Sequence, residues 1–145
     1  MEVSLSYWLA KTEPETYGYA DLVRLGRDRW NGVKNPVALK HIKSMQPGDR
    51  VFIYHTGKQK AIAGVAKVVS QPYPDPELGN PRFVVVDLEP EYPLPRPVTL
   101  KEIKADPRFQ DWVLVHQPRL SVMPVAEEDW DLVLFLSRTP SGPGF

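Results

Sequence analysis

The residues best suited to bind a planar ligand lie close together in the chain, at positions 30–35. Trp30 offers an aromatic face on which a base can stack, and Gly32 allows the backbone to come close to a ligand. Asn35 and the proline after it are a good helix start, whose free N–H groups and dipole favour a phosphate or carbonyl oxygen beside the charge of Lys34. The stretch predicts one wall of a binding pocket. A lone Trp next to a Gly is also typical of a core aromatic packed on a turn, and that interpretation stays open.

Two predicted strand ends supply further polar side chains. An aromatic and apolar strand near the N-terminus runs into Lys11 and Glu13, and a sheet end is a common place for binding groups. The strand at residues 51–56 is largely apolar until Tyr54 and His55, which we expect as polar tips at an opening. The alternatives are a weak surface ion pair for the first two, and a hydrogen-bonded structural histidine for His55, because no nucleophile motif is linked to it.

Composition excludes several kinds of chemistry. The chain of 145 residues contains no cysteine, which rules out disulfides, thiolate nucleophiles and cysteine-ligated zinc. Its 3 histidines lie 14 or more residues apart and lack the spacing of a helical metal-binding pair. We therefore predict no metal, no cofactor and no catalytic residue. The enzymatic alternative would use Glu13 or His55 as a general acid or base on a bound ligand.

Length and composition indicate one ordinary globular domain. The chain is 42% hydrophobic and 25% charged, and it is long enough to bury a core. No stretch reaches the roughly 18 apolar residues of a membrane span, and no signal-peptide pattern is visible, so we predict a cytoplasmic protein without a membrane partner, with a monomer favoured. The 16 prolines and few asparagines favour a thermophilic source, although a loop-rich β fold also raises the proline count.

The net charge is zero, but the charges are segregated along the chain. Residues 24–67 carry ten Lys or Arg and two Asp, a net of +8, whereas residues 68–145 carry seven basic and twelve acidic side chains. A positive face on a neutral protein attracts a polyanion locally without coating nucleic acid indiscriminately. The alternative is that the basic residues only populate a solvated helix and turns.

The predicted elements are those of an α+β domain. Runs rich in β-formers, separated by Pro and Gly breaks, predict a small barrel or a strongly curved sheet. Gly64 marks a bulge or a close approach within one strand. The predicted strands are residues 6–10, 51–56, 61–69, 83–88 and 119–125, and the predicted helices are residues 19–25, a helix from residue 36, residues 100–104 and residues 127–137. Between them we expect a proline-rich connection at residues 90–97 and an irregular segment at residues 109–116, with a flexible tail at residues 138–145.

Several of these segments occur in a recognisable order: residues 7–14, 30–35, 54–56, 73–75 and 119–125. In this arrangement the chain resembles the EVE domain family over nearly its whole length, to about Ser137. The resemblance implies a PUA-like fold for residues 1–137, with a curved β-sheet or small β-barrel and peripheral short helices. It also implies a non-catalytic module with a pocket for a nucleobase, often a modified one such as a methylated cytosine. On that analogy the ligand-binding residues are Lys11, Thr12, Glu13, Trp30, Asn31, Gly32, Val33, Lys34, Asn35, Tyr54, His55, Arg119 and Ser121.

Two positions depart from the family's usual Trp-Asp-Gly-Val-Arg-Asn motif, since Asn31 replaces Asp and Lys34 replaces Arg. Lysine keeps the charge but loses the planar fork that forms two parallel hydrogen bonds with a phosphate or a guanine. Asn31 donates as well as accepts, so it reads a base edge differently from Asp. The preferred base therefore does not carry over from the family.

The resulting prediction is a module that binds nucleic acid through a modified or flipped-out base stacked on Trp30. Stacking contributes roughly 1 to 3 kcal/mol and extrusion from a duplex costs a few, so a single-stranded or already modified base in RNA or DNA is the easier target. The alternatives are a domain that binds a free nucleoside-like metabolite, a protein-interaction domain and a base-modifying enzyme.

Overall fold

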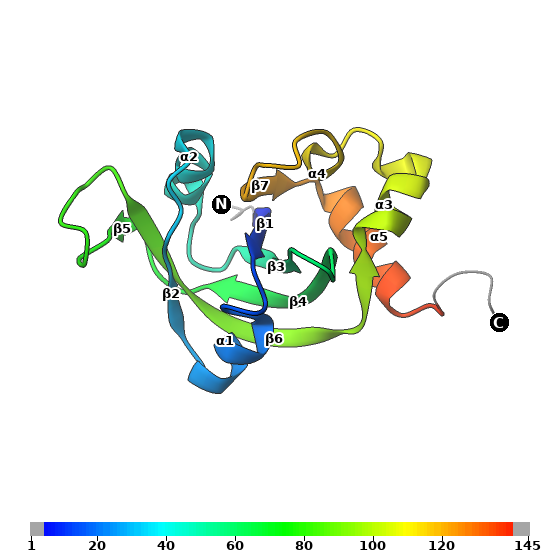
Figure 1. Cartoon of the computed structure of the whole chain (residues 1–145), viewed down its shortest axis with the longest axis horizontal. Helices are drawn as coiled ribbons and strands as arrows, with labels where there is room; N and C mark the ends of the chain where they lie inside the picture. The colour runs from blue at the N-terminus through cyan, green and yellow to red at the C-terminus, as the bar shows by residue number, and fades with distance from the viewer. Residues whose placement is uncertain (1–4, 141–145) are drawn as a thin grey trace.

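The computed structural model describes residues 5–140, which form a curled mixed β-sheet, a half-barrel, with short helices at its periphery (Figure 1). In chain order its elements are β1 (Tyr7–Thr12), α1 (Tyr19–Leu25), β2 (Asp28–Trp30), α2 (Pro36–Ser44), β3 (Arg50–His55), β4 (Ala61–Val68), β5 (Tyr73–Pro74), β6 (Val84–Thr99), α3 (Leu100–Ala105), the 3-10 helix η1 (Pro107–Phe109), α4 (Val113–His116), β7 (Val122–Val125) and α5 (Glu127–Ser137). The strand order is β2-β6-β4-β3-β1-β7, and β5 pairs with β6. The predicted α+β class with a curved sheet is confirmed.

The strand β1 lies next to one edge of the sheet. It pairs in parallel with β3, with Thr12 opposite His55, and antiparallel with the edge strand β7. The other edge strand, β2, pairs antiparallel with β6. Because the sheet curls without closing, the end of β1 and the edge strand β2 provide two separate walls for the site described below (Figure 1).

The strand β6 is the largest difference from the predicted elements. It continues through the proline-rich segment 90–97, for which a connection is expected, so that prediction is wrong. Pro90 and Pro93 lie opposite Ala66 and Gly64, next to the register shifts of the β4–β6 ladder. A proline has no N–H to give to the ladder, and irregular positions such as these tolerate the missing donor.

Three shorter segments also differ from the predictions. The strand β2 lies outside the predicted strands, because its 3 residues are too short to show an alternating pattern. The strand β7 begins at Val122 rather than at residue 119, since a turn precedes it in which the Leu120 N–H donates to the Gln117 carbonyl at 3.1 Å. The segment 109–116, expected to be irregular, contains the end of η1 and the short helix α4.

The helices agree closely with the sequence signals at their ends. Gly26 ends α1 in the left-handed conformation, with φ of 77°. The Asn35 side chain caps α2 by accepting from the N–H groups of Val37 and Ala38 at 2.9 and 3.1 Å. Thr99 and its N3 residue form the predicted capping box of α3. These predictions are confirmed because each depends on neighbours only a few residues away.

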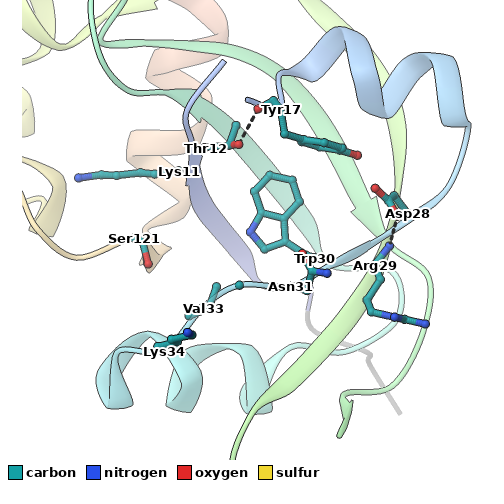
Figure 2. A pocket seen from close by; sticks show the side chains of 11 residues that line it. Lys11, Thr12, Tyr17, Asp28, Arg29, Trp30, Asn31, Val33, Lys34 and Ser121 are labelled. Atoms are coloured by element: carbon teal, nitrogen blue, oxygen red, sulfur yellow. Dashed lines mark hydrogen bonds between the residues drawn. The ribbon is translucent and has the colours of Figure 1, made fainter. Parts of the chain in front are cut away.

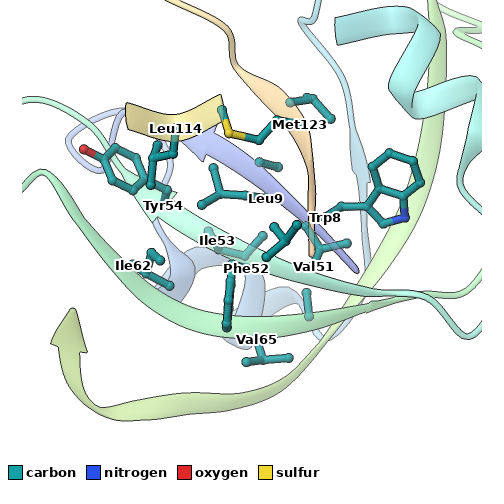
Figure 3. Packing of buried hydrophobic residues seen from close by; sticks show 14 of the residues in the cluster. Trp8, Leu9, Val51, Phe52, Ile53, Tyr54, Ile62, Val65, Leu114 and Met123 are labelled. Atoms are coloured by element: carbon teal, nitrogen blue, oxygen red, sulfur yellow. The ribbon is translucent and has the colours of Figure 1, made fainter. Parts of the chain in front are cut away.

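The core combines residues of the sheet with buried residues of all five α-helices, and it contains most of the aromatic residues. Phe52 and Trp130 stack with ring centroids 3.7 Å apart, and Tyr7 stacks on the same indole at 4.6 Å. Figure 3 shows the adjoining apolar layer, which comes from β1, β3 and β4 and from Leu114 and Met123. Trp8, Trp112 and Trp130 are all buried.

Two positions show how tightly this core is specified. Gly64 has no space for a side chain, because a Cβ built there would lie 2.6 Å from the Tyr19 ring, whose hydroxyl donates to the Val65 carbonyl at 2.8 Å. Gly64 is therefore a close-approach point as well as lying at a register shift. The buried Asp49 carboxylate accepts from the Trp8 indole N–H at 2.9 Å and from the N–H groups of Ser6 and Gln46 at 3.1 and 3.0 Å.

The C-terminal segment after α5 is described only as far as residue 140. There the Thr139 carbonyl accepts from the Arg96 guanidinium at 2.6 Å. The rest of the predicted flexible tail, residues 141–145, lies outside the described residues. Within residues 5–140, no helix has both the length and the apolar character needed to cross a membrane.

Candidate functional site

A cavity of about 290 Å³ opens where β1, β2 and the loop after β2 meet (Figure 2). Its size is near the lower end for small-molecule sites. Both polar and apolar groups line it: Lys11, Thr12, Tyr17, Asp28, Arg29, Trp30, Asn31, Gly32, Val33, Lys34 and Ser121. The cavity therefore combines the loop 31–34 with side chains from two strands that are not neighbours in the sheet.

Trp30 lies in the middle of the cavity wall, and its side chain is only partly available. The residue is 8% exposed and belongs to the hydrophobic core, while the aromatic ring of Tyr17 meets the indole edge-on at a centroid distance of 6.0 Å and an angle of 82°. Both interpretations of Trp30 from the sequence therefore hold at once, since it packs in the core and also lines a cavity. In Figure 2 the indole lies between the Asp28 side and the Ser121 side.

One side of the cavity carries an acidic group beside a phenol. One oxygen of the Asp28 carboxylate accepts from the Arg29 N–H at 2.8 Å, and the carboxylate faces the Tyr17 hydroxyl (Figure 2). Burial and then the neighbouring Asp28 carboxylate raise the pKa of Tyr17 well above its ordinary value. The phenol therefore keeps its proton at neutral pH and remains a hydrogen-bond donor.

The opposite side of the cavity is basic. The Lys11 ammonium donates to the Pro118 carbonyl at 2.8 Å and lies 5.5 Å from the centre of the Tyr54 ring. Burial lowers the pKa of Lys11. Lys34 is exposed at the rim, and Figure 2 shows it with Ser121 on the same side of the indole as Lys11. This arrangement places positive charge across the cavity from the Asp28 carboxylate.

The structure brings most of the predicted binding residues to this one cavity. Eight of them line it, namely Lys11, Thr12, Trp30, Asn31, Gly32, Val33, Lys34 and Ser121. Lys11 and Thr12 reach the cavity because they lie at the end of β1. Thr12 is also tied to the loop after β1, because its hydroxyl donates to the Tyr17 carbonyl at 2.6 Å.

Tyr54 and His55 occupy a different environment from the one expected. Both are buried rather than placed as polar tips at an opening, and neither lines the cavity. His55 Nε2 accepts from the Tyr19 N–H at 3.0 Å, and its Nδ1 lies 2.7 Å from the Gln59 side-chain oxygen. The expectation is corrected because β3 is a central strand and the start of α1 covers its end. His55 has the contacts of a structural histidine.

The remaining predicted residues lie beside the cavity. Glu13 accepts from the Thr56 hydroxyl at 3.1 Å. The Asn35 side-chain oxygen is occupied by the capping of α2. Arg119 and Asn35 line an adjacent open groove with Val37. These three predicted residues are next to the cavity wall but do not form it.

Three cavity residues, Tyr17, Asp28 and Arg29, are absent from the sequence-based prediction. For Asp28 the signal depends on recognising β2 as a strand, because side chains two residues apart in a strand share a face. Asp28 and Trp30 have that spacing in β2. Arg29 faces the other way, where its guanidinium donates to the Tyr73 hydroxyl at 3.3 Å. Tyr17 lies in the loop between β1 and α1 and has no such signal. Among residues 5–140 we find no group of three or more His, Asp or Glu that could hold a metal ion.

Comparison with known proteins identifies the family. Residues 6–136 match the EVE domain. The chain belongs to the EVE domain family. Thymocyte nuclear protein 1 of Danio rerio is 30% identical in an alignment of 170 positions, gaps included, and the alignment covers 93% of this chain and 73% of the relative. The recognition made from the sequence motifs is confirmed.

Solved structures of EVE-related proteins have the same fold as this EVE domain. The NMR structure of Rpa0253 from Rhodopseudomonas palustris is 41% identical, with a TM-score of 0.87, and the match covers 92% of this chain and 93% of the other. The crystal structure of human THYN1 protein in complex with 5-methylcytosine-containing DNA is 28% identical, with a TM-score of 0.86, and covers 93% and 99% of the two chains.

Proposed function

We propose that this EVE domain is a non-catalytic module that binds nucleic acid by taking a modified base, such as 5-methylcytosine, into the cavity beside Trp30. The observation that carries the proposal is the cavity itself, whose wall combines the indole of Trp30 with the acidic Asp28 on one side and the basic Lys11 and Lys34 on the other. The human relative crystallised with DNA containing 5-methylcytosine supports it, because that relative shares the fold over 93% of this chain.

The charges around the cavity support a polyanionic ligand. Lys34, Lys40 and Lys43 lie on or just before α2, and none of them is in an ion pair within the described part of the chain. Phosphates attached to a bound base pass close to this rim if the base enters beside Trp30. Neutralising phosphates releases counterions, so we expect the affinity to fall as the salt concentration rises.

The energetics favour single-stranded or weakly paired targets. Stacking of a base on an aromatic residue contributes roughly 1 to 3 kcal/mol, whereas extruding a base from a duplex costs a few kcal/mol. The two contributions nearly cancel for a well-paired duplex. We therefore expect tighter binding to a single strand, or to a duplex in which the target base is mismatched.

The experiment measures binding of labelled single-stranded oligonucleotides by fluorescence anisotropy at low salt, with one central 5-methylcytosine. Trp30→Ala should weaken binding by about five- to 150-fold, the equivalent of the stacking energy. Because Trp30 is 8% exposed, the same change also lowers the free energy of unfolding by about 3 to 5 kcal/mol, so circular dichroism must confirm the fold.

Two further variants separate stacking from stability. Trp30→Phe keeps an aromatic face in the cavity wall and should retain part of the affinity. Trp112→Phe removes an equally buried indole outside the cavity and should bind like the wild type. No binding of any DNA or RNA oligonucleotide by the wild type at low salt would contradict the proposal.

A further inference from the structure

We infer that the Asp28 carboxylate, positioned by Tyr17, reads the edge of the bound base and selects bases with an exocyclic amino group. Cytosine and adenine have such a group, whereas thymine and uracil do not. The inference rests on the proposed function, because it assigns the specificity of the same cavity. It concerns two residues outside the sequence motif, and it gives the cavity a preference that stacking on Trp30 does not provide.

Backbone geometry places the carboxylate next to the indole. Asp28 and Trp30 are the first and last residues of β2, so their side chains project to the same face of the strand. Both line the cavity, and β2 is held in register by its pairing with β6, where Asp28 lies opposite Leu88 and Trp30 opposite Val86. A ring packed beside the indole therefore presents one of its edges to Asp28.

The Asp28 carboxylate has accepting capacity that the protein does not use. Within residues 5–140 its one hydrogen bond is from the Arg29 N–H at 2.8 Å, and it has no ion pair. The two arginines nearest in sequence have other partners. Arg27 pairs with Asp87 at 3.0 Å, and Arg29 pairs with Glu77 at 3.4 Å. A carboxylate has about four acceptor sites, so Asp28 can accept from a ligand donor in addition to Arg29 and the facing Tyr17 phenol.

Tyr17 positions the carboxylate. Its hydroxyl is directed toward Asp28 (Figure 2), and its pKa is raised by burial and by the neighbouring carboxylate. The Tyr17 hydroxyl oxygen itself is buried, so a ligand does not reach it. The phenol therefore acts through Asp28, by holding the carboxylate at the cavity wall.

The charges of the cavity orient the ligand. Asp28 lies on one side of the indole, and Lys11 and Lys34 lie on the other (Figure 2). A nucleotide carries its negative charge on the phosphate and its hydrogen-bond donors on the base edge. The favoured orientation therefore directs the phosphate toward the lysines and the amino edge of the base toward Asp28.

The resulting hydrogen bond distinguishes 5-methylcytosine from thymine. The N4 amino group of 5-methylcytosine donates to the Asp28 carboxylate. Thymine places its O4 carbonyl at the same position, where two acceptors face each other and the contact is mismatched. The two bases share the ring and the methyl group, which leaves this edge as the difference between them.

The experiment compares two single-stranded oligonucleotides that differ only in a central 5-methylcytosine or thymine, with affinities measured by fluorescence anisotropy. The wild type should bind the 5-methylcytosine strand about ten-fold or more tightly, as expected for a hydrogen bond to a charged group. In Asp28→Asn the side-chain oxygen can still accept from Arg29, while the amide can donate to O4, so the ratio should fall to about one. Tyr17→Phe should reduce the ratio less.

Glu77→Gln is the matched control. It removes the same charge from an exposed neighbour that lies outside the cavity wall, so the preference should stay as in the wild type. A wild type that binds both strands equally, with binding that still depends on Trp30, would overturn the base-edge assignment and leave the proposed function intact. A folded Asp28→Asn variant that keeps the wild-type affinity ratio would also overturn the assignment, whether its affinity for the two strands stays unchanged or falls by the same factor for both. Failure of the wild type to bind either strand would instead contradict the proposed function.

Discussion

The four tryptophans show how one residue type takes different roles according to its contacts. Trp130 stacks between Tyr7 and Phe52, and Trp30 forms part of the cavity wall. Trp8 donates its indole N–H to the buried Asp49, whereas the equally buried N–H of Trp112 has no hydrogen-bond partner among the described residues. The last two offer a matched comparison, since they differ chiefly in one hydrogen bond.

Trp8→Phe should destabilise the protein more than Trp112→Phe. Both changes remove a similar volume of indole from the core. The first also leaves the Asp49 carboxylate without one of its three donors, which costs about 1 to 3 kcal/mol, while the second removes an unsatisfied buried donor. Urea unfolding measures the two free energies. Equal losses in the two variants would show that the Trp8 hydrogen bond contributes nothing measurable.

At the scale of the element, the start of α2 connects stability with the site. Asn35 ends the loop that carries Lys34, and its side-chain oxygen accepts from two N–H groups of the first helical turn. This cap fixes where the helix begins and therefore where Lys34 lies at the cavity rim. Asn35 belongs to the predicted binding residues, but its position in the structure indicates that it acts through the helix.

Asn35→Ala should lower the free energy of unfolding by about 1 kcal/mol because the cap is lost. Asn35→Asp should stay within a few tenths of a kcal/mol of the wild type, since Asp caps as well and its charge interacts favourably with the helix dipole. Urea unfolding of the three proteins tests this. A loss of similar size in both variants would mean that the Asn35 amide group has a further essential contact.

At the scale of the whole molecule, folding redistributes the charge that the chain carries. The arginines of the basic segment are largely paired, for example Arg27 with Asp87 and Arg50 with Glu91, while the lysines of α2 keep no ion pair among residues 5–140. Three lysines without an ion pair to any residue that the structure describes, Lys34, Lys40 and Lys43, lie at or on α2, and three more in the same basic segment, Lys58, Lys60 and Lys67, lie in the β3–β4 hairpin or on β4. A protein of zero net charge can attract a phosphate chain through the lysines next to the cavity.

Lys34→Gln should reduce the slope of log affinity against log salt by about 0.7, the contribution of one phosphate on a single strand. Lys104→Gln removes the same charge from α3, which lies far from α2, and should leave the slope unchanged (Figure 1). Anisotropy titrations at several salt concentrations measure both variants. An equal decrease in both slopes would indicate that only the overall charge of the protein matters.

The parts of the fold that the sequence predicts are those whose determinants are local. Gly26 ends α1, Asn35 caps α2 and Thr99 begins α3, and each acts on N–H or carbonyl groups within about four residues. The apolar strands β3 and β4 follow from alternation and turn residues in the same way. The loop 31–34 is also visible in the sequence, because its aromatic, glycine and lysine are adjacent.

Only the tertiary structure decides the features that depend on residues far apart in the chain. The strand β6 continues past Pro90 because the irregular β4 ladder accepts it, and His55 is buried because Tyr19, 36 positions earlier, covers it. Asp28 joins the cavity because β2 pairs with β6, about 60 residues later in the chain, and Tyr17 joins it because its ring packs edge-on against Trp30. Helix caps are satisfied by adjacent residues, whereas sheet pairing and burial depend on residues that meet only after the chain has folded.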